Sequence, residues 1–194
     1  MKNIILLILI LITFNACSLK QTTYTLNKYT LKYDNLKKYN TINKTIIINK
    51  PTINPIYNTT DMIYSTQEYK VESYIKNKWS DIPNLIIHQE LMSSFDKNGL
   101  FNTTYIYPNK EKANYSINTH IYKIENKIKN NISYAILSIK FEIYKDKKLF
   151  DTYFYDKSLK NISLQPYDFV KSENILFNEI INDLSNRLYS KLKN

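Results

Sequence analysis

Few residues in this chain have side chains suited to catalysis or metal binding. The sequence contains one cysteine, Cys17, and two histidines, His88 and His120. Nucleophilic catalysis needs a nucleophile beside a base, and a metal site needs several converging His, Cys, Asp or Glu side chains. No spacing in the sequence singles out such a set. We therefore expect a non-enzymatic protein without metal or cofactor, with His88 hydrogen-bonded in the core and His120 on a strand surface.

Gly99 is the only glycine among 194 residues. Phosphate-binding loops need several glycines, because backbone N–H groups must approach the phosphate closely, and a nucleophile elbow also needs glycines around its serine. The glycine count therefore excludes these two kinds of site.

Cys17 directly follows an apolar run near the N-terminus. Lys2 precedes nine consecutive Ile and Leu residues, 4–12, and Ala16 stands immediately before the cysteine. This is the pattern of an export signal, and the run is too short for a permanent transmembrane helix. It resembles a bacterial lipobox, in which the thiol receives a diacylglycerol and the new amino group an acyl chain such as palmitate. The alternative is an ordinary export signal with an incidental cysteine.

Lipid attachment at Cys17 would decide where the protein works. One acyl chain gives marginal membrane binding, whereas two or three hold a protein firmly. Ser18 follows the cysteine, and lipoproteins of double-membrane bacteria that lack Asp there generally move to the outer membrane. We expect a lipid-anchored protein on the periplasmic face of the outer membrane. This location argues against a nucleic-acid partner, despite the net charge of +10.

The sequence predicts three parts: a signal peptide over 1–16, a basic tether with a possible short strand over 17–43, and a single α+β domain over 44–194. From Cys17 to Lys50 there are seven Lys and one Asp. These lysines either lie against phospholipid headgroups or belong to a solvated linker. Both readings stay open.

Within the domain, β-branched and alternating segments predict strands, and apolar residues at helical spacing predict helices. The strands are expected over 45–48, 62–65, 69–76 and 115–121, with a hairpin over 133–155. In the strand 69–76, the residues Tyr69, Val71, Ser73 and Ile75 share one face. The helices are expected over 83–97 and 177–188. The fold class is thus α+β, with a mixed, mainly antiparallel sheet and two amphipathic helices packed on one face.

The first helix has signals at both ends. Pro83 is suited to the first helical position, with Ser80 or Asp81 before it as the cap, and Gly99 is suited to the left-handed stop. The apolar stripe of this helix consists of Ile87, His88, Leu91, Met92 and Phe95.

Aromatic residues offer a second kind of candidate site. Trp79, the sole tryptophan, lies at the junction between a strand and the first helix. It either plugs the helix start against the sheet or stacks on a ligand, and both readings stay open. Tyrosines with exposed rings offer a partner surface, because Tyr gives large area at low entropic cost. The candidates are Tyr64, Tyr74, Tyr134 and Tyr155.

The segment from Met62 to Phe101 resembles the ABC-type transport auxiliary lipoproteins, the outer-membrane partners of MCE-type lipid transport systems. In that family a strand ending in a Tyr-containing segment leads to Arg-Trp, a Pro, and a helix that ends in Gly and an aromatic residue. Here a lysine stands in place of the Arg. The residues that carry the resemblance are Tyr64, Tyr69, Tyr74, Lys78, Trp79, Pro83, Gly99 and Phe101.

The resemblance implies a function and partners. It implies a non-enzymatic component that works with an ABC permease, its ATPase and a periplasmic MCE-domain protein, and that docks this carrier at the outer membrane. Phospholipid is a further candidate partner, and the resemblance is compatible with a homo-oligomer. The alternative is a structural lipoprotein that assists assembly of an outer-membrane or envelope complex.

Overall fold

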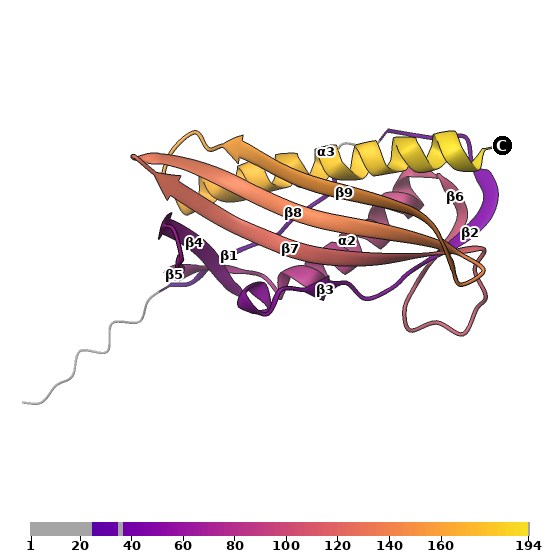
Figure 1. Ribbon diagram of the computed structural model, residues 1–194, viewed down its shortest axis with the longest axis horizontal. Helices are drawn as coiled ribbons and strands as arrows, with labels where there is room; N and C mark the ends of the chain where they lie inside the picture. The colour runs from indigo at the N-terminus through magenta and orange to yellow at the C-terminus, as the bar shows by residue number, and fades with distance from the viewer. Residues whose placement is uncertain (1–24, 35–36, 194) are drawn as a thin grey trace, which may run out of the picture.

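The structure, a computed structural model, describes residues 25–34 and 37–193. In this part of the chain a nine-stranded mixed sheet curls around two helices, which confirms the predicted α+β fold. Figure 1 shows the long strands running beside the C-terminal helix. The predicted signal peptide and Cys17 lie outside the described residues.

Three long antiparallel strands form one side of the sheet, with the last of them at its edge. They are β7 (Tyr115–Lys129), β8 (Ile132–Lys145) and β9 (Lys148–Lys160). Two-residue turns join them, and each turn holds both residues at positive φ: Asn130 and Asn131 at 51° and 59°, and Asp146 and Lys147 at 49° and 64°. Such turns match the twist of paired strands. The predicted hairpin over 133–155 is therefore confirmed.

The other edge of β7 pairs in succession with three short parallel strands. These are β2 (Ile42–Ile48), β3 (Thr52–Ile53) and β4 (Asp61–Gln67), with the short helix η1 (Pro55–Tyr57) before β4. The sheet continues from β2 to the parallel β6, and from β4 through the antiparallel β5 to the parallel β1. These strands are β1 (Asn27–Tyr29), β5 (Lys70–Trp79) and β6 (Phe101–Ile106).

Helix α2 (Pro83–Asn98) has the predicted bounds to within one residue. Gly99 ends it at φ 71°, in the left-handed region where a side chain is disfavoured. The predicted cap is wrong, because Ile82 is the capping residue and no side chain caps the helix. Asp81 instead accepts a hydrogen bond from the neighbouring N–H of Ile82 at 2.7 Å.

Helix α3 (Pro166–Leu192) starts earlier than the predicted 177. Its first turns bury Phe169 and Val170, and Pro166 is its first residue. The predicted stripe of α3 is buried, and in α2 only Met92 of the predicted stripe is half-buried. The buried stripe residues of α3 are Phe177, Ile180, Ile181, Leu184 and Leu188. Both helices thus contribute to one continuous core.

The folded body begins inside the segment that the sequence assigned to the tether. β1 pairs with the end of β5, and Leu31 and Tyr33 are each only 1% exposed. The physical reason is the alternation at 29, 31 and 33, which places these side chains on the inner side of an extended chain.

The strand predicted over 69–76 needs two corrections. Tyr69 lies in the turn before β5, with φ 65° and a 97% exposed side chain. At the other end, β5 continues to Trp79 because β1 pairs with residues 77–79 and extends the strand. The strand β6, whose Asn and Thr residues break the alternation, was not predicted.

Candidate functional site

Trp79 is the centre of the motif that carried the family resemblance. Its side chain is 1% exposed and contacts Phe169 of α3 edge-on, with the ring centroids 5.9 Å apart. Its backbone N–H donates to the carbonyl of Thr60 at 2.8 Å. Because protein encloses the ring, Trp79 plugs the core and offers no free face to a ligand.

The neighbours of Trp79 are also held by contacts within the protein. Lys78 places Nζ 2.6 Å from Oδ1 of Asp61. The rings of Tyr64 and Tyr74 lie 4.7 Å apart, and the hydroxyl of Tyr74 accepts a hydrogen bond from Asn126 at 2.7 Å. Burial raises the pKa of Tyr74. These two tyrosines therefore join strands to each other rather than present a partner surface.

The remaining motif residues frame α2, with one exception. Pro83 begins the helix, Gly99 ends it, and Phe101 packs edge-on against Phe95 with centroids 5.6 Å apart. Tyr69 is the exception, since its ring projects from the β4–β5 turn into solvent. The motif residues therefore join a strand to a helix, and among them only Tyr69 has a side chain exposed enough to contact a partner.

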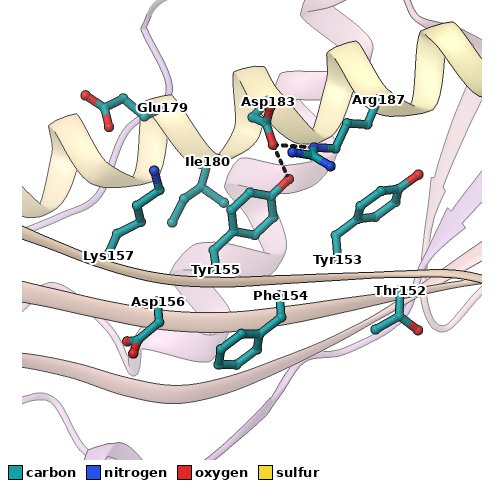
Figure 2. Close-up of a pocket in the computed structure, with 10 residues that line it drawn as sticks. All are labelled: Thr152, Tyr153, Phe154, Tyr155, Asp156, Lys157, Glu179, Ile180, Asp183 and Arg187. Atoms are coloured by element: carbon teal, nitrogen blue, oxygen red, sulfur yellow. Dashed lines mark hydrogen bonds and ion pairs between the residues drawn. The ribbon is translucent and has the colours of Figure 1, made fainter.

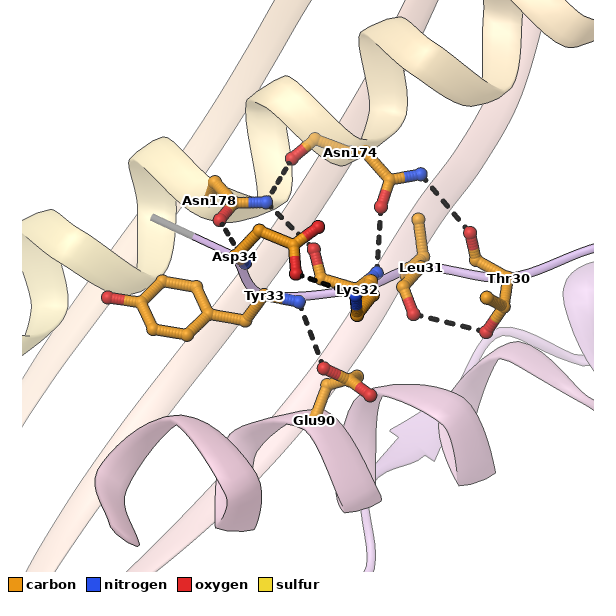
Figure 3. Close-up of polar contacts among 8 residues, drawn as sticks. All are labelled: Thr30, Leu31, Lys32, Tyr33, Asp34, Glu90, Asn174 and Asn178. Carbon is orange, nitrogen blue, oxygen red and sulfur yellow. Dashed lines mark hydrogen bonds and ion pairs between the residues drawn. The ribbon is translucent and has the colours of Figure 1, made fainter. Parts of the chain in front are cut away.

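A segment of extended chain, residues 30–34, lies between α2 and α3, and we call it the strap (Figure 3). Asn174 of α3 accepts from the N–H of Lys32 at 2.7 Å and donates to the carbonyl of Thr30 at 3.2 Å. Asn178, one turn later, accepts from Asp34 N–H at 3.0 Å and donates to the carbonyl of Lys32 at 2.9 Å. The side-chain amides thus replace the partner strand of a sheet.

The opposite side of the strap is held by α2. Glu90 accepts a hydrogen bond from the N–H of Tyr33 at 2.9 Å. The hydroxyl of Tyr33 donates to Asn182 of α3 at 2.6 Å, and Tyr39 donates to Asn186 at 2.8 Å. Burial raises the pKa of Tyr39 to about 12. The N-terminal segment is therefore fixed to both helices.

Four asparagines at four-residue spacing make these contacts from α3, and we call them the asparagine ladder. They are Asn174, Asn178, Asn182 and Asn186. Residues four apart lie on one side of a helix, so the spacing alone marks a polar line suited to another segment of chain. The sequence prediction missed this line because asparagine in a helix resembles an ordinary solvated residue.

A groove of about 510 Å³ runs between β9 and α3 (Figure 2). Its centre is Asp183, which accepts hydrogen bonds from the hydroxyl of Tyr155 at 2.8 Å and from Nε of Arg187 at 2.6 Å. Burial, followed by the bond to Asp183, raises the pKa of Tyr155. Figure 2 shows Phe154 and Asp156 pointing to the other side of β9.

The groove does not bring together a catalytic set. Its charged groups are Asp183 and Arg187, which bind each other, Lys157 and Glu179 near one end, and Asp156, which points to the other side of β9. Tyr155, predicted as an exposed partner residue, is only 7% exposed because it packs beneath α3. Tyr134, the other tyrosine of that prediction, is half-buried on β8.

Both histidines lie where the sequence predicted. His88 is 5% exposed, and its Nε2 lies 3.0 Å from the carbonyl oxygen of Ile48, which fixes it as a core residue. His120 lies on the surface of β7 between the hydroxyl of Thr52 at 2.8 Å and Glu142 at 3.2 Å.

A hydroxyl, an imidazole and a carboxylate follow one another here, as in the catalytic triad of a hydrolase: Thr52, His120 and Glu142. Their surroundings differ from those of a triad. Thr52 is exposed on the sheet, and Lys140 donates to the second carboxylate oxygen of Glu142 at 2.6 Å. That hydrogen bond is the main reason that the pKa of Glu142 is lowered. We interpret these contacts as a link between β3, β7 and β8.

The described residues contain no grouped metal ligands and no helix suited to span a membrane. In residues 25–34 and 37–193 no three His, Cys, Asp or Glu side chains are grouped so that they could hold a metal ion. Over the same residues, neither helix combines the length and apolarity required to cross a bilayer.

The curled sheet over two helices is a fold that other proteins share. Protein XCC0632 from Xanthomonas campestris, of family DUF330, superposes with a TM-score of 0.73 at 9% identity, covering 85% of this chain and 95% of that chain. An uncharacterized protein superposes with a TM-score of 0.67 at 11% identity, covering 84% and 99%. No family model and no curated protein sequence matches this chain. At these identities the likeness shows the fold alone.

Proposed function

We propose that this chain is a non-enzymatic, lipid-anchored protein on the periplasmic face of the outer membrane. In this proposal it belongs to an ABC/MCE-type lipid transport system and docks the periplasmic MCE carrier at that membrane. The permease and ATPase of the system act at the inner membrane.

One observation carries the proposal: Cys17, the sole cysteine, directly follows an apolar run of export-signal length. A thiol in an exported chain without a second cysteine has no disulfide partner in that chain, and lipid attachment explains its place. The resemblance of the segment from Met62 to Phe101 to auxiliary lipoproteins adds the transport role.

The structure supports a short distance between the anchor and the folded body. Thr25 is the first described residue, eight residues after Cys17. A fully extended chain spans at most about 3.6 Å per residue, so the body would stay within roughly 30 Å of the acylated cysteine. The strap then holds the chain to both helices. A body held in this way would present a fixed end to the membrane and the other end to the carrier.

The first test combines chemistry and partners in one sample. The full-length protein is extracted from membranes, and mass spectrometry examines both its N-terminal peptide and the proteins that co-purify. We expect acylated Cys17 and an MCE-domain protein. An unmodified Cys17 would overturn the anchor, and acylation with an outer-membrane barrel protein in place of the carrier would overturn the transport role.

The second test separates the anchor from the fold. A deletion strain is complemented with the wild type, with Cys17→Ala, and with a conservative variant of the body such as Lys78→Arg. We expect lipid-transport function from the wild type and Lys78→Arg, but not from Cys17→Ala. Full complementation by a soluble periplasmic form would contradict the need for the tether.

A further inference from the structure

Exposed apolar side chains lie at the end of the body where the described chain begins, just before β1. Tyr69 is 97% exposed, Ile162 86% and Ile75 79%, and Val71 and Leu164 are also exposed. Tyr69, Val71 and Ile75 belong to the β4–β5 hairpin, and the other two to the loop between β9 and α3. We call these five residues the tether-end patch.

Hydrogen bonds hold the two parts of the patch at one end of the sheet. The side-chain Nδ2 of Asn126 in β7 donates to the hydroxyl of Tyr74 in β5 at 2.7 Å. The Oδ1 of the same Asn126 accepts from Nδ2 of Asn161 at 3.0 Å. The backbone N–H of Asn161 also donates to the carbonyl of Ser133 at 2.8 Å. The residue after Asn161 is Ile162, so the loop lies over the strand ends that the hairpin adjoins. Figure 1 shows the β4–β5 turn and the start of α3 at this same end.

The charge around the patch is basic on balance, because the groove beside the hairpin is lined by four lysines, at 70, 123, 127 and 129, and by two glutamates, Glu68 and Glu125. Exposed lysines flank it at positions 127 and 129 of β7 and at 160 of β9. Lys127 and Lys129 line the same groove as residues 65–71 of the hairpin. An apolar patch rimmed by lysines and containing a tyrosine has the composition of surfaces that lie in the headgroup region of anionic membranes.

We propose that the tether-end patch is a membrane-contacting surface that inserts its apolar side chains among anionic phospholipid headgroups. This inference rests on the anchor of the proposed function for its geometry, because the eight residues from Cys17 to Thr25 bring this end to the bilayer. The opposite end cannot reach the bilayer at the same time, since the 15-residue strand β7 extends about 50 Å at ~3.3 Å per residue. The β8–β9 turn at that end then faces the periplasm.

The test uses the chain from Ser18 onward, which lacks the acylation site. Its core is complete, because the buried core residues run from Leu31 to Leu192. The probes are vesicles of phosphatidylethanolamine with phosphatidylglycerol, and vesicles of phosphatidylcholine alone, with co-sedimentation as the measurement. We expect binding to the anionic vesicles that weakens with added salt.

A triple variant, Tyr69→Ser with Ile75→Ser and Ile162→Ser, should lower vesicle affinity by about tenfold or more. The matched control replaces three other exposed apolar residues outside the patch, Tyr107, Leu149 and Phe154, which are 55%, 58% and 59% exposed. The control should bind as the wild type does. Thermal melting checks that both variants fold, which we expect because all six side chains are exposed.

Two results of the vesicle measurement would overturn the proposal: no binding of the wild-type chain to anionic vesicles, or equal loss of affinity in the control variant. In the pull-down from membranes, loss of a co-purifying protein by the triple variant, with its vesicle binding unchanged, would assign the patch to a protein partner. Because this chain lacks Cys17, the vesicle measurement is independent of acylation and of the MCE carrier. A failure of the patch and a failure of the proposed function are therefore distinguishable.

Discussion

Glu173 places a carboxyl group in the core, on the face of α3 that packs against the sheet. The side chain is fully buried, and neither oxygen has a partner in hydrogen-bonding geometry. Burial raises the pKa of this carboxyl well above its usual range, and the charge of Glu125 raises it further, while the backbone at Ile136 opposes the shift. A buried carboxyl avoids the cost of an unpaired charge by staying protonated.

This raised pKa predicts a pH dependence of stability. A group whose pKa is higher in the folded state stabilises the fold below its unfolded-state pKa, and this contribution is lost as the pH rises through the folded-state pKa. The free energy of unfolding should therefore fall by up to about 1.4 kcal/mol per pH unit above ~4.3. Glu173→Gln should remove this slope in thermal melts across pH, whereas Glu179→Gln, on the exposed side of α3, should keep it. A wild-type slope that survives in Glu173→Gln would assign it to other groups.

The apolar stripes of the helices predict a second set of effects at single residues. Leu91 of α2 and Phe177 of α3 are fully buried, whereas Met92 is half-buried. Leu91→Ala and Phe177→Ala should each lower the free energy of unfolding by ~2 to 5 kcal/mol, because each leaves a cavity in a packed core. Met92→Ala, the control, should cost less. Urea denaturation measures all three, and equal losses would mean that the stripe is misplaced.

At the scale of elements, the asparagine ladder explains why an extended segment without strand partners stays in place. Each of Asn174 and Asn178 binds one N–H and one carbonyl of the strap. A hydrogen bond in a protein contributes ~1 kcal/mol net to the free energy of unfolding. The two asparagines together therefore stabilise the fold by as much as a buried apolar side chain does.

Replacing both asparagines by alanine should release part of the strap. In native-state hydrogen exchange, the amides of Lys32 and Asp34 should exchange about tenfold faster or more, because both lose their acceptors. Exchange of the Tyr33 amide should change less, because this N–H donates to Glu90 and keeps its acceptor. The exposed Ser190→Ala on the same helix serves as the control. Unchanged protection at Lys32 and Asp34 would show that the asparagines do not hold the strap.

The same elements show what the sequence could predict. Regular signals succeeded: alternation over 133–155 predicted the hairpin, and Pro83 and Gly99 predicted both ends of α2. The position of the strap was not predicted, because it depends on side chains more than 140 residues away in the sequence. A local sequence pattern contains no such information. The candidate site was predicted least well, since a motif of aromatic residues does not distinguish a plug such as Trp79 from an exposed ring such as Tyr69.

At the scale of the whole molecule, the body is one core enclosed by the curled sheet, and its N-terminal segment is part of that core. Leu31 and Tyr33 fill the space between the two helices, and β1 closes the edge of the sheet beside β5. The link from Cys17 to the body is therefore shorter than the tether of residues 17–43 that the sequence predicted. With Cys17 anchored as proposed, a short link would restrict how far the body can turn relative to the membrane, which is the geometry that the tether-end patch requires.

The extent of the body can be tested by truncation. A chain that starts at residue 25 keeps all of the described core, from Leu31 to Leu192, and serves as the reference. A chain that starts at residue 35 loses Leu31 and Tyr33, and burial of two such side chains contributes about 3 to 6 kcal/mol. Its free energy of unfolding should fall by that amount, and Leu31→Ala in the longer chain should reproduce ~2 to 5 kcal/mol of the loss. Equal stability of the two truncated chains would place the start of the body after the strap, and the anchor would then hold the body on a longer and freer link.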